Sequence, residues 1–84
     1  MGYPAVTALT ILPNPNTGSF IINLSAPNNE NAQVFITNIV GEKIKEFSII
    51  TNQETAIQLV APPGIYFLTA VTAQGTQSAK LLVR

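Results

Sequence analysis

The sequence contains no histidine, cysteine, tryptophan or aspartate. The usual ligands of zinc and softer metals are therefore missing, as are the thiol nucleophile and the imidazole base of many enzymes. The acidic side chains are four glutamates, and Glu42 and Glu46 would lie about 13 Å apart along a strand, farther than glycosidase carboxylate pairs. We predict no catalytic residue, no metal site and no cofactor, so the chain is not expected to be an enzyme.

Charge of either sign is also scarce, at 10% of 84 residues, and four basic residues balance four acidic ones. Such a chain has no field to attract phosphates or anionic lipid headgroups, so we expect no nucleic-acid partner. No apolar run approaches the roughly 20 residues that span a bilayer. Residues 1–4 lack the basic region and apolar core of a signal peptide. The absence of cysteine excludes disulfides and leaves the compartment open.

What the chain does have is a 46% apolar fraction arranged in short alternating runs, punctuated by proline, glycine and asparagine. This composition suits one small folded domain, and the period of two is typical of half-buried strands. We predict strands at Ala5–Leu12, Ser19–Leu24, Ala32–Asn38, Lys43–Ile50, Thr55–Val60, Ile65–Thr72 and Thr76–Arg84. About seven short strands predict an all-β fold, an immunoglobulin-like antiparallel β-sandwich.

The connections between these strands carry turn signals. Residues 13–15 read Pro-Asn-Pro and predict a stiff corner that Gly18 ends, and residues 38–41 and 73–75 predict hairpins. Residues 61–64 contain two prolines and cannot lie inside a central strand, whereas residues 25–31 predict an exposed loop.

Alternation along the strands assigns side chains to faces. The predicted inward set is Phe20, Ile22, Leu24, Val34, Ile36, Ile57, Leu59, Tyr66, Leu68 and Ala70. The opposite face carries Ile21, Phe35, Ile65, Phe67 and Val71. We expect a mixture of strands buried on both sides and an apolar patch offered to a partner.

Two motifs near the end of the chain have structural interpretations. Tyr66 begins a core strand two residues after Gly64, and we expect a tyrosine corner, in which its hydroxyl bonds a nearby backbone group. The last strand should place Leu81 and Val83 on one face and Lys80, Leu82 and Arg84 on the other. As a signal, this strand would offer an exposed edge or tail for capture by strand addition and by charge pairing of its two cations.

In order and spacing, these motifs resemble the C-terminal sorting domain of proteins exported by the bacterial type IX secretion system. The resemblance runs from about Leu9 to Arg84 and includes the central segment from Val34 to Ile44. Taken alone, the Pro-Asn-Pro corner is only a turn; together with the other motifs it is specific. Leu12, Asn38 and Glu42 depart mildly from the family pattern. The structural motif residues are Pro13, Asn14, Pro15, Gly18, Phe20, Asn38, Gly41, Gly64 and Tyr66. The recognition residues implied by the resemblance are Lys80, Leu81, Leu82, Val83 and Arg84.

Membership would imply that a cargo protein crosses the inner membrane by its own signal peptide and folds in the periplasm. The domain would then direct the cargo through the outer-membrane translocon and its shuttle components. A sortase-like peptidase would remove the domain by a cut in or before residues 2–10, upstream of the Pro-Asn-Pro corner, leaving the cargo secreted or at the cell surface. Residues 1–8 would be a linker or an added N-terminal segment and residues 9–84 the sorting domain. It would bind no small molecule and be a monomer or associate weakly.

A second interpretation is a carbohydrate-binding or adhesive module of a secreted protein, since β-sandwiches often serve that purpose. Sugar-binding surfaces usually combine exposed aromatic rings with carboxylates. This chain has no tryptophan, two tyrosines and four phenylalanines, so the aromatic supply is small.

Overall fold

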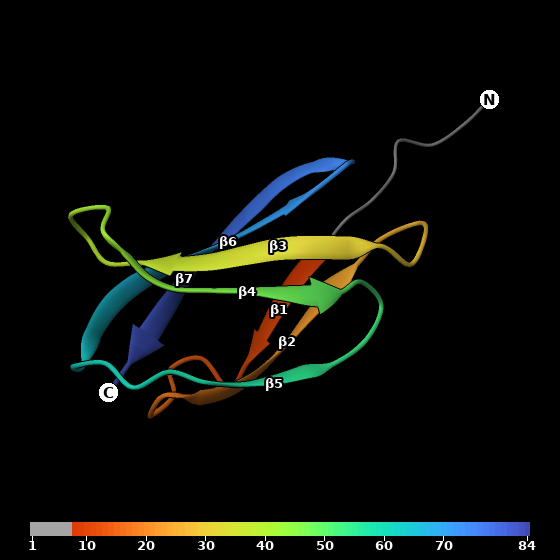
Figure 1. Cartoon of the computed structure of the whole chain (residues 1–84). Helices are drawn as coiled ribbons and strands as arrows, with labels where there is room; N and C mark the ends of the chain where they lie inside the picture. Colours follow the sequence, from red (N-terminus) through yellow and green to blue (C-terminus); the bar gives the residue numbers. More distant parts are fainter. Residues whose placement is uncertain (1–7) are drawn as a thin grey trace.

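The computed structural model describes residues 8–84 and shows two β-sheets packed face to face (Figure 1). The strands are β1 (Ala8–Leu12), β2 (Ser19–Ser25), β3 (Asn31–Thr37), β4 (Lys43–Ile50), β5 (Thr55–Gln58), β6 (Gly64–Thr72) and β7 (Gly75–Val83). A search of these residues finds no helix capable of spanning a bilayer.

The smaller sheet has the strand order β1-β2-β5, and the larger has the order β4-β3-β6-β7. All neighbouring strands within each sheet are antiparallel. The arrangement confirms the predicted immunoglobulin-like antiparallel sandwich of seven strands. β7 lies at one edge of the larger sheet and β4 at the other.

Strand positions follow the alternation of the sequence, with small differences at the ends. β4 has the predicted limits, whereas β5 ends at Gln58 rather than at Val60. Val60 is 90% exposed and precedes a segment with two prolines, which cannot donate backbone hydrogen bonds to a ladder. Of the predicted first strand, Ala8–Leu12 is present and residues 5–7 lie outside the described residues.

The core lies between the two sheets. Its buried apolar side chains are Ile11, Phe20, Ile22, Leu24, Ala32, Val34, Ile36, Ile49, Leu59, Tyr66, Leu68, Ala70, Leu81 and Val83. Nine of the ten predicted inward residues belong to this set. The tenth, Ile57, is half-buried and packs against the core, because β5 is an edge strand with a neighbour on one side.

The predicted outward face is also confirmed, and it remains largely apolar. Ile21, Ile65, Phe67 and Val71 are between 38% and 45% exposed. Phe35 is half-buried. The apolar outer residues therefore lie on both sheets, at the surface of the domain.

The predicted hairpin between β3 and β4 is held by two backbone hydrogen bonds, Asn38 N–H to Glu42 carbonyl and Gly41 N–H to Asn38 carbonyl, and by the side chain of Asn38. Asn38 Oδ1 accepts hydrogen bonds from the backbone N–H groups of Val40 and Glu42, and the Asn38 Nδ2 donates to a carboxylate oxygen of Glu42. Gly41 has a φ of 88°, a backbone region that favours glycine. The motif residues Asn38 and Gly41 thus belong to a turn beside β4, at the sheet edge opposite β7.

Candidate functional site

The candidate site is the last strand, β7, together with the next residue, Arg84. Along this segment Leu81 is fully buried and Val83 is 6% exposed, while Lys80 and Arg84 are exposed and Leu82 is half-buried. The pleat therefore divides the five predicted recognition residues as expected. Leu81 and Val83 anchor the strand in the core, and the other three face outward.

Asn14, in the Pro-Asn-Pro corner, hydrogen-bonds to the backbone of this segment. Its Nδ2 donates to the carbonyl of Lys80 at 2.8 Å, and its Oδ1 accepts from the N–H of Leu82 at 2.9 Å. One side-chain amide thus makes the donor and acceptor contacts that a peptide group of a neighbouring strand would make.

Asn16 continues the contact with its main chain. Its N–H donates to the carbonyl of Leu82 at 2.9 Å, its carbonyl accepts from the N–H of Arg84 at 2.8 Å, and it forms a parallel bridge with Val83. Its side chain folds back: Nδ2 donates to the carbonyl of Pro13, and Oδ1 accepts from the N–H of Gly18. Asn16 is only 3% exposed, so these groups have little access to water.

The expectation of an open edge over residues 80–84 is therefore wrong. Backbone groups of a strand point alternately to its two sides, and those of Lys80, Leu82 and Arg84 point away from β6 toward the corner. Four of them already have partners on Asn14 and Asn16. The corner covers this edge of β7 as a short strand would, which is a known way of protecting an edge.

Gly18 fixes the other end of the corner. It has a φ of 109°, and a Cβ placed on it would lie 2.5 Å from the carbonyl oxygen of Leu59. The Gly18 carbonyl accepts a 2.7 Å hydrogen bond from the Leu59 N–H, and Phe20 follows with its ring in the core. The corner therefore joins the smaller sheet to the edge of β7. Only glycine suits residue 18 in this structure, because its φ is positive and because the Leu59 carbonyl oxygen lies so close to it.

Tyr66 confirms the predicted tyrosine corner. The side chain is 5% exposed, and its hydroxyl donates a short hydrogen bond to the carbonyl of Pro62, four residues earlier. This contact fixes residues 62–66 at the start of β6. Tyr66 thus serves the fold, as the core position of the motif indicates.

Two polar residues with a comparable role were missed from the sequence. Thr51 is fully buried; its hydroxyl donates to the carbonyl of Asn28 and accepts from the N–H of Glu30. Asn52, with a φ of 64°, forms hydrogen bonds through its side chain with both backbone groups of Ala26. These bonds connect the loop predicted at residues 25–31 to the β4–β5 connection. No local sequence pattern predicts them, because their partners lie more than 20 positions apart.

The charges on the larger sheet are distributed unevenly. Lys43 lies 3.1 Å from a carboxylate oxygen of Glu46 and 5.4 Å from the ring centroid of Phe35. Within residues 8–84, neither Lys80 nor Arg84 has an ion pair. The same residues bring together no cluster of three acidic side chains that could hold a metal ion.

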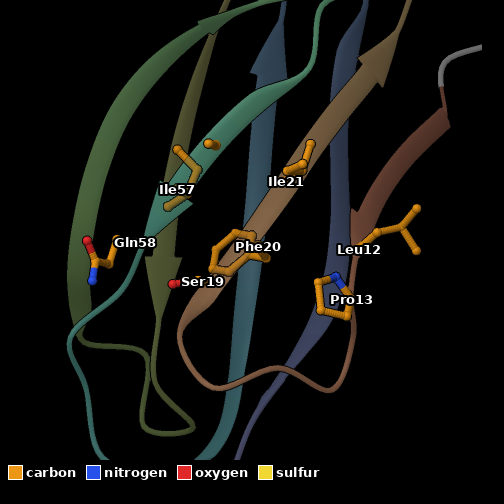
Figure 2. Close-up of a pocket in the computed structure, with 8 residues that line it drawn as sticks. Leu12, Pro13, Ser19, Phe20, Ile21, Ile57 and Gln58 are labelled. Atoms are coloured by element: carbon orange, nitrogen blue, oxygen red, sulfur yellow. The ribbon is translucent and has the colours of Figure 1, made fainter.

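A hollow of about 480 Å³ lies on the smaller sheet. It is lined by Leu12, Pro13, Ser19, Phe20, Ile21, Ala56, Ile57 and Gln58. Figure 2 shows Phe20 and Ile21 in its centre, between Leu12 and Pro13 on one side and Ile57 and Gln58 on the other. The lining carries no charged side chain, and its aromatic ring, Phe20, is 3% exposed. Such a surface does not supply the exposed rings and carboxylates typical of sugar binding.

The fold and the site define a class of protein: an all-β sandwich whose last strand is anchored in the core and covered along its edge by an N-terminal corner. The model of the secretion system C-terminal sorting domain family matches residues 10–84, so the chain belongs to that family. These domains are sorting signals of type IX secretion and mark proteins for export to the cell surface or beyond, which implies interaction with the secretion machinery. A comparison with individually curated proteins found no match.

Proposed function

We propose that this domain is a non-catalytic address that directs a cargo protein through the outer-membrane type IX translocon after passage through the periplasm. The family match over residues 10–84 carries this proposal. Shuttle components of the translocon are the expected first partners. The domain acts by being bound, and its sandwich keeps the terminal strand in one fixed geometry.

Within the domain, residues 80–84 are the segment that the machinery recognises. Lys80, Leu82 and Arg84 offer their side chains to a receptor, while Leu81 and Val83 hold the strand in register. This division of roles uses the pleat: each residue serves either the core or the receptor, and none has to serve both.

Removal of the domain by a sortase-like peptidase completes the pathway, and the cut lies in or before residues 2–10. The part before Ala8 is favoured, since residues 8–12 already pair with β2. Backbone engaged in a sheet is a poor protease substrate, so residues 8–10 are the less suitable part of this range. The cargo then lies at the cell surface or in the medium.

A secretion assay tests the proposal. The full chain is fused behind a fluorescent protein with a signal peptide, in a host that has this machinery, and fluorescence is compared between medium, cell surface and periplasm. We expect export of the fusion and periplasmic retention of the same protein without the domain. Equal retention of both proteins would contradict the proposal.

Deleting residues 80–84 is a less informative variant than substituting them. The deletion removes Leu81 and Val83 from the core and leaves the corner residues Asn14 and Asn16 without their partners. Loss of export would then report unfolding as well as loss of the signal. Substitution of outward side chains keeps the two effects apart.

A further inference from the structure

The outer face of β6 and β7 places apolar and basic side chains side by side. Ile65 lies directly opposite Leu82, and Phe67 lies opposite Lys80. Because directly opposed residues on one face have neighbouring side chains, these four form a continuous surface. With Arg84, which continues the same face, we call it the β6–β7 outer patch.

The patch is exposed and its charge is uncompensated. Ile65 and Phe67 are 45% and 40% exposed. Lys80 and Arg84 have no ion pair within the described residues.

The neighbouring half of the same sheet differs in this respect. There Lys43 is balanced by Glu46 and lies over the ring of Phe35. On the outer face of the larger sheet, the positive charge on β4 is therefore paired with a carboxylate, whereas the positive charges at the end of the chain, beside the apolar residues of β6 and β7, have no ion-pair partner within the described residues.

The covered edge decides how this segment can be recognised. Adding a receptor strand beside residues 80–84 would require displacing Asn14 and Asn16 from four backbone hydrogen bonds. Asn16 is buried and makes two further bonds through its side chain, so its displacement would disrupt the corner itself. The outer patch, by contrast, is open to a partner without any rearrangement of these contacts.

We infer that the β6–β7 outer patch is the docking surface of this domain and that its partner is a protein surface of apolar residues bordered by carboxylates. The inference rests on the proposed function and names the surface through which it operates. Apolar contact with Ile65, Phe67 and Leu82 supplies buried area, while carboxylates placed opposite Lys80 and Arg84 supply orientation and faster association.

The test uses the same fusion of the full chain and measures the exported fraction of variants. Lys80→Glu combined with Arg84→Glu reverses the charge of the patch, and Phe67→Ser removes its central apolar side chain. Each should lower export by about tenfold or more, as expected when a central contact of an interface is lost.

Control variants carry changes of the same kind elsewhere, with one charge reversed instead of two and one apolar side chain replaced by serine. Lys45→Glu reverses a charge on β4, on the inner-facing side at the far edge of the sheet, and Ile21→Ser removes an apolar side chain, 43% exposed, from the smaller sheet. Both should export as the unaltered chain does. Melting of each purified variant confirms that the fold is retained.

The outcomes separate the surface from the proposed function. If the unaltered fusion is not exported, the proposed function fails and the inference fails with it. If the unaltered fusion and controls are exported and the folded patch variants are too, only the patch is overturned. Asn14→Ala would free the backbone of Lys80 and Leu82 at the edge of β7, so faster export of this variant would assign recognition to that edge instead of the patch. If the unaltered chain sediments as a dimer and only the Phe67→Ser variant sediments as a monomer, the patch binds a second copy of the chain instead of the secretion machinery.

Discussion

Asn16 should contribute more to stability than its position in a turn suggests, and Asn16→Ala measures that contribution. The substitution leaves the backbone contacts with β7 in place and removes two side-chain hydrogen bonds, one to the Pro13 carbonyl and one from the Gly18 N–H. The bond with Gly18 is buried. Water therefore has little opportunity to replace the missing oxygen.

The magnitude follows from these two bonds. The bond to the Pro13 carbonyl contributes about 0.5–1.5 kcal/mol, and leaving the buried Gly18 N–H unsatisfied costs about 1–3 kcal/mol, so the expected loss is about 1.5–4.5 kcal/mol. Asn14→Ala is the matched control. Its two bonds with β7 are exposed, so water can take them over and the loss should stay at or below about 1 kcal/mol.

Urea unfolding at equilibrium is the appropriate assay for both variants. With a slope of about 1 kcal/mol per M for a small domain, the midpoint of Asn16→Ala should fall by about 1.5 M or more at an unchanged slope. Equal losses for Asn14→Ala and Asn16→Ala, or a loss below about 1 kcal/mol for the buried residue, would refute the reasoning. Either result would mean that water or a shifted backbone satisfies the Gly18 N–H.

Three further substitutions test other contacts of the fold. Gly18→Ala should lose about 2–4 kcal/mol, since it combines a φ of 109° with an approach of 2.5 Å to the Leu59 carbonyl oxygen. Tyr66→Ala should lose about 3–5 kcal/mol by opening a cavity in the core, and an unchanged melting temperature would contradict the face assignment. Thr51→Val should lose about 1–3 kcal/mol, because it leaves two backbone groups near β3 without their partner.

Matched substitutions isolate each cause. Gly41→Ala places a side chain at a φ of 88° with no atom within 4 Å, so it should lose less than Gly18→Ala, and equal losses would exclude the close contact as a cause. Tyr66→Phe keeps the ring and should lose about 0.5–1.5 kcal/mol for the hydroxyl alone. Thr51→Ser keeps the hydroxyl, and a loss as large as that of Thr51→Val would show that the methyl group matters more than the hydrogen bonds.

The sequence by itself determined the strands and their faces. Alternation of the kind seen in residues 19–24 and 65–72 forces one set of side chains inward, because successive residues of a strand point to opposite sides. The same rule assigned Leu81 and Val83 to the core and Lys80, Leu82 and Arg84 to the outer face. Turn residues such as Gly18 and Asn38 were also identifiable, since their conformational preferences are local.

Only the tertiary structure decided which backbone groups remained available. Asn14 and Lys80 lie 66 positions apart in the sequence. Neither the alternation of side chains nor any turn preference indicates that the Asn14 side chain would hydrogen-bond to the backbone of Lys80 at the edge of β7. The buried bonds of Thr51 and the irregular pairing between Ile36 and Thr37 are likewise invisible in the sequence. Side-chain alternation is a local property of each strand, whereas the pairing of an edge depends on which distant segment the packed sheets bring beside it.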